Sequence, residues 1–201
     1  MKSCFLILLA VLVLSLVACN EISTQKYSEV EEQTFSVGDS STLQVENFAG
    51  DVTLRVGKSG TVQVVATKRA ARESNLDDIE VDIRERENGL QIETDPPSGL
   101  KNVSVSFEIT VPADTSVNLH TGAGEIIVPG LEGQVMVDTG AGEIEIRDVR
   151  GSIDAHTGAG EIDVRDVVGS VRLDTGAGDI DDERWRAGEC RFDTGGGCIK
   201  L

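Results

Sequence analysis

Acidic side chains recur at a fixed interval in the C-terminal half of the chain, where they could bind cations. Two series of carboxylates repeat every 18 residues: Glu125, Glu143, Glu161 and Asp179 form the first, and Glu145, Asp163 and Asp181 form the second. If the interval brings them into register on neighbouring strands, like charges repel unless a divalent cation or an arginine neutralises them. Arg147 and Arg165 adjoin the second series and could do so without metal. We expect a solvated acidic face rather than a metal site.

A second polar series follows the same interval and alternates imidazole with carboxylate: His120, Asp138, His156, Asp174 and Asp193. Such a series could in principle form a transition-metal cluster or a catalytic pair. The chain has only two histidines, two intervals apart, and no Ser or Cys nucleophile lies beside them in a recognisable arrangement. Cross-strand pairing of His with Asp is the interpretation we favour, and we expect no enzyme activity and no cofactor.

Glycine-rich turns raise the two further possibilities of a phosphate loop and a calcium site. Thr-Gly-Ala-Gly begins at 121, 139, 157 and 175, and Thr-Gly-Gly-Gly begins at 194. A phosphate loop needs one such turn before a helix, whereas this turn recurs and is followed by Glu or Asp. A calcium β-roll needs Asp two residues after the last Gly, but Ile126, Ile144 and Ile162 occupy that place. The glycines therefore indicate structural corners.

The elements that carry these residues are short strands. Glycine also recurs nearly every nine residues from Gly124 to Gly197, and each interval contains apolar residues that alternate with polar ones. Alternation at period two between glycine turns is typical of strands. Strands this short bury one face only by stacking, so we predict an all-β, single-stranded β-solenoid (β-helix or β-roll-like) with 18-residue coils and two strands per coil. The threonines of the turns would form a column that exchanges side-chain hydrogen bonds.

Upstream of the clean repeats, which span 117–201, the pattern is less regular. Residues 47–54 and 60–64 look like degraded copies of the unit, and 79–84, 90–93 and 103–111 are strand candidates. Asn88-Gly89 predicts a hairpin turn between the first two of these candidates.

The last coil departs from the repeat. The interval from Gly178 to Gly188 is ten residues rather than nine, and Asp182 stands in an apolar series. We expect a bulge that turns Asp182 outward, and Trp185 covering the last coil with Phe192 nearby.

The N-terminus has the features of an export signal. An apolar run from Phe5 to Ala18, interrupted by Ser15, is too short to span a bilayer. Leu16-Val17-Ala18-Cys19 resembles the bacterial lipobox, which implies that the Cys19 thiol is lipidated; an ordinary signal cleaved after Ala18 is the alternative. We expect a signal peptide at 1–18, a lipidated tether at 19–33 with a strand beginning near Thr34, and the solenoid domain at 34–201.

Two cysteines are left if Cys4 is removed and Cys19 is lipidated. Cys190 and Cys198 form an isolated pair in an exported protein, which makes them a disulfide candidate. The alternative is that both are small packing residues, because sequence does not test the distance that a disulfide requires.

Composition restricts the partners. The net charge of -17 argues against nucleic-acid binding, which needs clustered Lys and Arg. The 201 residues suffice for one ordinary domain, and aromatic residues are only 3% of them, so the core must be built from Val, Ile and Leu.

The chain from about Leu43 onward resembles a bacterial family of unknown function named "putative adhesin". The resemblance rests on Gly50-Asp51-Val52, on Val111-Pro112-Ala113 and on the tandem Thr-Gly-Ala-Gly-Glu-Ile repeats. It implies a β-solenoid envelope protein and supplies no catalytic residues.

These observations predict a lipid-anchored, non-catalytic binding or structural module of the bacterial cell envelope. If the cell is Gram-negative, the module would be held on the outer membrane, at the periplasmic or surface face. Its partner would be another envelope protein or a surface ligand. An accessory subunit of an envelope assembly or signalling complex is the main alternative. A carbohydrate-active β-helix enzyme is less favoured, because short coils leave no long loops to wall a groove.

Overall fold

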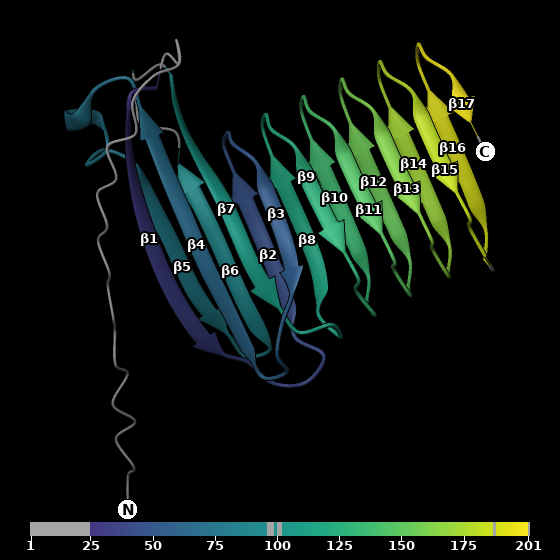
Figure 1. Ribbon diagram of the computed structural model, residues 1–201, viewed down its shortest axis with the longest axis horizontal. Helices are drawn as coiled ribbons and strands as arrows, with labels where there is room; N and C mark the ends of the chain where they lie inside the picture. Colours follow the sequence, from purple (N-terminus) through teal and green to yellow (C-terminus); the bar gives the residue numbers. More distant parts are fainter. Residues whose placement is uncertain (1–24, 96–98, 100–101, 187, 201) are drawn as a thin grey trace, which may run out of the picture.

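The computed structural model describes residues 25–95, 99, 102–186 and 188–200. Those residues are all-β apart from one three-residue 3-10 helix at Glu73–Asn75, and none of their helices is long and apolar enough to cross a membrane. Their strands form two mixed sheets, nine-stranded sheet A and eight-stranded sheet B, which face each other (Figure 1). The signal peptide, the lipobox and Cys19 lie outside the described residues.

The two sheets have the following strands. Sheet A contains, in spatial order, β1 (Tyr27–Ser36), β4 (Thr61–Ala70), β7 (Val103–Val111), β3 (Val52–Val56), β9 (Ile126–Pro129), β11 (Ile144–Arg147), β13 (Ile162–Arg165), β15 (Ile180–Glu183) and β17 (Ile199–Lys200). Sheet B contains β16 (Cys190–Thr194), β14 (Val171–Thr175), β12 (Ile153–Thr157), β10 (Val135–Thr139), β8 (Ser116–Thr121), β2 (Thr42–Asn47), β6 (Gly89–Asp95) and β5 (Glu80–Arg86).

From β8 onward the chain alternates between the two sheets. Each 18-residue unit, here called a coil, adds one strand to each sheet, parallel to the strand of the coil before it. Val135 therefore pairs with Ile153, and Ile144 with Ile162. The predicted period and the two strands per coil are both present in this register, and Figure 1 shows the coils stacked along the long axis.

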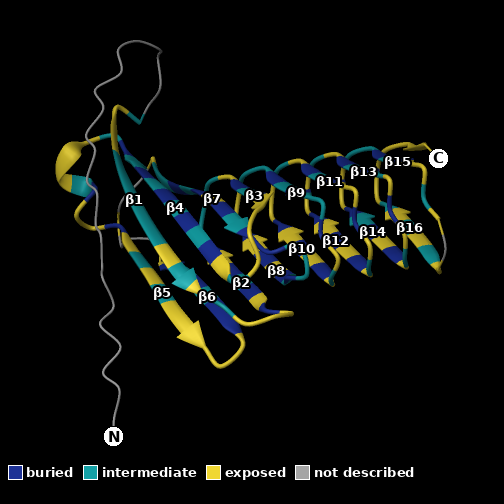
Figure 2. Cartoon of the chain, turned by 60° about the horizontal axis from the view of Figure 1, so that its bottom comes forward, coloured by how far each residue is buried: buried dark blue, intermediate teal, exposed yellow. Residues whose placement is uncertain are grey.

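The core lies between the sheets and is built from aliphatic columns. Residues at alternate positions of each strand are buried, and the positions between them are half-buried or exposed. One column contains Val128, Ile146 and Val164, all fully buried. Figure 2 shows the same alternation as dark blue and yellow along the strands of the repeats. Because like residues stack on like residues, each coil extends one continuous core.

The threonine column is present, but its hydrogen bonds differ from the expected ones. Each threonine hydroxyl donates to a glycine carbonyl in the turn of the preceding coil: Thr157 to Gly142 and Thr175 to Gly160, both at 3.0 Å. Thr121, Thr139, Thr157 and Thr175 are fully buried at the end of the core, and Thr194, in the last coil, is half-buried. Their hydroxyls therefore satisfy buried turn carbonyls instead of bonding to one another.

The N-terminal part of the molecule is not a run of degraded coils. β4, expected as a copy of the unit, lies antiparallel between β1 and β7. β5 and β6 form the hairpin that Asn88-Gly89 predicts. β2 and β3 continue the parallel stack next to β8 and β9, and β6 and β7 add one further parallel strand to each sheet beyond them. The long strands β1, β4, β5, β6 and β7 extend the two sheets at this end of the molecule (Figure 1).

The tether is shorter than its expected span of 19–33. β1 begins at Tyr27, seven residues before Thr34, and pairs with β4 over ten residues. Glu31 and Gln33 are half-buried, and Glu31 forms an ion pair of 2.5 Å with Lys68. Backbone pairing along β4 gives this polar sequence a place in sheet A, which composition alone does not predict.

Asp182 faces inward, contrary to expectation. It pairs with Val164 in unbroken 18-residue register and is 6% exposed. Val168 still pairs with Arg186, 18 residues on, whereas Val171 pairs with Cys190, 19 residues on. The extra residue therefore lies between Arg186 and Cys190, too late in the chain to turn Asp182 outward.

Trp185 packs at the end of the core. It is half-buried, and its indole Nε1 donates to the Gly169 carbonyl at 2.8 Å. Phe192 is also half-buried against the core cluster.

Cys190 and Cys198 are free thiols, so the expected disulfide is absent. Cys190 begins β16, whereas Cys198 follows the glycine turn beyond the other end of that strand. The five residues of β16 span about 13 Å, roughly twice the Cα separation that a disulfide allows. Burial, with a smaller effect of Asp182, raises the pKa of the Cys190 thiol.

Candidate functional site

The first series of carboxylates forms a continuous column beside the glycine turns. Each member directly precedes a strand of sheet A, and the pairing of those strands sets them one strand spacing apart, about 4.8 Å. The structure adds one residue that the sequence repeats do not mark, because Val52 pairs with Ile126 and so places Asp51 beside Glu125. We call this set the acidic column: Asp51, Glu125, Glu143, Glu161 and Asp179.

Backbone contacts fix both ends of the acidic column. The Glu125 amide donates to Asp51 Oδ1 at 3.1 Å, and the Cys198 amide donates to Asp179 Oδ1 at 2.8 Å. Glu143 and Glu161, in the middle, are exposed and have no ion pair among the described residues. The column therefore presents uncompensated negative charge. Asp51 could have been found from sequence, because Gly50-Asp51-Val52 matches the Gly-acid-apolar step of the repeats.

The second series lies on the outer face of sheet A and is largely neutralised within its own strands. Arg165 donates to both carboxylate oxygens of Asp163 at 2.8 and 2.7 Å. This hydrogen bonding and the charge of Asp163 raise the pKa of Arg165. Arg147 forms an ion pair with Glu145. Asp181 has no ion pair among the described residues, because Glu183 stands where the preceding coil has Arg165. The side chains of Glu145 and Asp163 are only 15% and 14% exposed, so they contribute little to a binding face.

The alternating series on sheet B forms the expected cross-strand pairs. His120 Nδ1 lies 3.7 Å from Asp138 Oδ1, and His156 Nδ1 lies 3.7 Å from Asp174 Oδ1. All four side chains are about half exposed. Among the residues that the structure describes, no three His, Cys, Asp or Glu side chains gather as a metal site would require.

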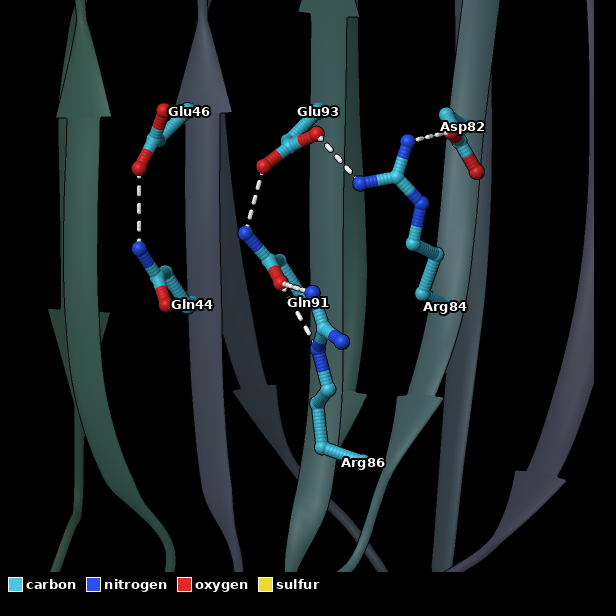
Figure 3. A network of polar contacts seen from close by, with 7 residues as sticks. All are labelled: Gln44, Glu46, Asp82, Arg84, Arg86, Gln91 and Glu93. Carbon is cyan, nitrogen blue, oxygen red and sulfur yellow. Dashed lines mark hydrogen bonds and ion pairs between the residues drawn. The ribbon is translucent and has the colours of Figure 1, made fainter.

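A polar network covers the outer face of sheet B at its N-terminal end and was not predicted from sequence. Arg84 binds Asp82 and also Glu93, the latter at 2.9 Å, and Arg86 Nε donates to Gln91 Oε1 at 2.7 Å (Figure 3). On the neighbouring strand β2, Gln44 donates a hydrogen bond to Glu46. These contacts join β5 to β6 and use most of the charges of this face, so the network is better explained as support for the hairpin.

Comparisons with known proteins find similar folds at low sequence identity. No protein-family profile and no curated protein matches the chain. Among solved structures, a "putative cell adhesion protein" of Clostridium sporogenes is 14% identical, with a TM-score of 0.48, over 85% of this chain and 98% of that one. A "putative adhesin" of Bacteroides fragilis is 10% identical, with a TM-score of 0.35, over 86% and 97%.

A third solved structure bears a different description. A "putative lipid binding protein" of Parabacteroides distasonis is 11% identical, with a TM-score of 0.24, over 86% of this chain and 96% of that one. Similarity at these levels does not by itself identify a function.

Proposed function

We propose that this protein is a lipid-anchored, non-catalytic binding module of the bacterial cell envelope, built as a β-solenoid, whose acidic column binds a basic region of a partner protein. The observation that carries the proposal is the acidic column itself. It is an array of carboxylates whose middle members have no ion pair among the described residues, beside a second series in which arginines neutralise Glu145 and Asp163.

The array suits recognition of a cationic, extended partner. Carboxylates at strand spacing repel one another, and a row of Lys or Arg side chains would relieve that repulsion. The net charge of -17 adds a long-range attraction for basic partners, which raises the association rate more than the affinity. Binding through such a face weakens as salt screens the charges.

The anchor is proposed from Leu16-Val17-Ala18-Cys19. Lipid on Cys19 would hold the module at a membrane, and residues 20–26 would act as a spacer before β1. Envelope attachment restricts the partners of the acidic column to other envelope proteins or to basic segments at the cell surface.

An accessory role in an envelope assembly or signalling complex would use the same acidic column. Co-purification separates the two possibilities, because an assembly subunit is recovered with fixed partners from membranes whereas a freely presented module is not. A carbohydrate-active enzyme is less favoured, because the described residues contain no recognisable catalytic constellation.

The test is capture of partners from solubilised envelopes of cells that express the wild-type chain or Glu143→Gln/Glu161→Gln. We expect the double variant to recover less of the basic partners, and wild-type capture to decline with added salt. Asp154→Asn/Asp193→Asn is the matched control, because it removes two exposed charges from sheet B and leaves the acidic column intact. If both double variants recover the same partners as wild type, the acidic column is not the binding site.

A further inference from the structure

A small notch lies at the ends of the strands opposite the glycine turns, where the chain returns from sheet A to sheet B. It has a volume of about 260 Å³ and is lined by Asp148, Arg150, Asp166, Val168, Arg184 and Arg186. The notch is below the size of pockets for drug-sized ligands, about 300 to 1,000 Å³, so it suits one small group or one sugar unit.

The base of the notch is a rigid column of three residues from successive coils. Arg150 pairs with Val168, and Val168 pairs with Arg186, as isolated parallel bridges. Their amides donate to the carbonyls of Leu131, Val149 and Val167 in the coils before them. Arg150 and Arg186 are thus two strand spacings apart, about 10 Å, on a fixed backbone.

The two arginines of the base carry uncompensated charge. Among the described residues, neither Arg150 nor Arg186 has an ion pair, and both are exposed. Arg184, in contrast, donates to Asp166 at 2.8 Å. Asp148 is the other carboxylate of the lining, and it has no ion pair among the described residues.

The other lining residues of the notch restrict the ligand in two further ways. Val168 is 40% exposed between the arginines and offers an apolar floor. Asp148 and Asp166 provide carboxylate oxygens along one wall, which accept hydrogen bonds from hydroxyl or ammonium groups. Arg150 and Arg186 are the two charged residues of the lining that have neither an ion pair among the described residues nor a negative charge of their own, so an anionic group suits the space between them.

We propose that this notch binds a carboxylate-bearing sugar. The carboxylate would lie over Val168 between Arg150 and Arg186, where the guanidinium groups offer paired N–H donors. The sugar hydroxyls would donate to the Asp148 side of the notch, and an apolar face of the ring would contact Val168. The site is distinct from the acidic column and does not depend on the proposed function.

The test titrates the full-length protein with galacturonate and glucuronate and follows binding by ligand-observed NMR. The uncharged methyl esters of the same sugars are the matched ligands. We expect the free acids to bind roughly tenfold more tightly than the esters, because an esterified carboxylate is uncharged and loses its charge-assisted contact with the arginines. Acetate, which lacks hydroxyl groups, should bind more weakly than either acid.

Variants locate the binding. Arg150→Gln and Arg186→Gln should each weaken uronate binding by about tenfold or more. Asp148→Asn should lower the affinity for uronates relative to acetate, because it removes a hydroxyl acceptor while its change of charge acts on both anions alike. Arg172→Gln, an exposed arginine on sheet B, should leave binding unchanged. Circular dichroism spectra confirm that each variant is folded.

Three results would overturn the proposal: no binding of either uronate, equal binding of acids and esters, or wild-type affinity in Arg150→Gln/Arg186→Gln. Preferential binding of an amino acid would also overturn it, because its ammonium group would then occupy the place beside Asp148.

Discussion

Asp182 places a carboxyl group where the preceding coils place Val164 and Ile146. It is 6% exposed, and its Oδ1 has no hydrogen-bond partner among the described residues. Burial, with a smaller effect of the charge of Asp181, raises the pKa of Asp182. The folded protein therefore holds this proton more tightly than the unfolded chain does, so stability falls as the pH rises from the unfolded pKa through the folded pKa.

Asp182→Val should consequently stabilise the protein at pH 7. The variant continues the aliphatic column and removes a buried, unsatisfied group, with an expected gain of roughly 1–3 kcal/mol. The pH-dependent part of the gain should vanish below the unfolded pKa of Asp, about 3.9. Thermal unfolding of variant and wild type from pH 3 to pH 8 measures both effects. A lower melting temperature at pH 7 would mean that the carboxylate has a stabilising partner.

The glycine turns let successive coils approach closely, and a substitution at one of these glycines tests how much this matters. Gly160 has φ of +153°, and a Cβ there would lie 2.0 Å from the Gly142 carbonyl oxygen. Gly160→Ala should destabilise the protein by more than about 1 kcal/mol, because neither the conformation nor the space suits alanine. Gly196, which stands where the earlier turns have Ala159 and Ala177, has open space at its Cβ and is the control. Denaturant unfolding compares the two; equal effects would contradict the account of the turns.

At the scale of the element, the pattern of hydrogen bonds between strands repeats once in each coil. Deleting residues 139–156 removes one coil and leaves each remaining strand facing an equivalent neighbour. We expect a folded, shorter protein, because each coil contacts mainly its neighbours. Deleting residues 139–147 removes half a coil, which would exchange the two sheets beyond the deletion and unfold the protein. Circular dichroism and thermal unfolding distinguish the two variants, and similar behaviour of both would rule out the two-strand coil.

Elements with strict repetition were the most predictable from sequence. Gly124, Gly142 and Gly160 mark the turns, and the alternation after each gives the strand, its face and its register. β1 and β4 were less predictable, because their neighbours are set by long-range antiparallel pairing that no local period reports. Asp182 was misplaced because the position of the extra residue within its ten-residue interval depends on the backbone.

Of the two candidate sites, the one that follows the repeat was predictable from sequence and the other was not. The acidic column follows directly from the 18-residue interval, although Asp51 joins it through β3, outside the clean repeats. The notch was missed because its residues occupy a corner where no two coils have the same sequence. Arg150 and Arg186 share a position, but Val168 interrupts the series between them, so no run of like residues marks the site in the sequence.

At the scale of the whole molecule, Cys19 tests the attachment to the envelope. Cys19→Ser should release the mature protein from the membrane fraction or leave the signal peptide uncleaved, because the lipid would be lost with the thiol. Fractionation and immunoblotting of cells that express each form measure the effect. Cys198→Ser is the matched control and should remain in the membrane fraction. A processed, membrane-bound Cys19→Ser protein would contradict lipid anchoring.

The direction of the inter-coil hydrogen bonds determines how the molecule responds to mechanical force. These bonds run from coil to coil along the long axis of the stack (Figure 1). Tension applied between the two ends of the stack should therefore detach the C-terminal coil first, because β16 and β17 pair with a neighbouring strand on one side only. Each detached coil would release 18 residues, about 60 Å of extended chain. Under load the protein would lengthen in steps of one coil, and its remaining coils would stay folded.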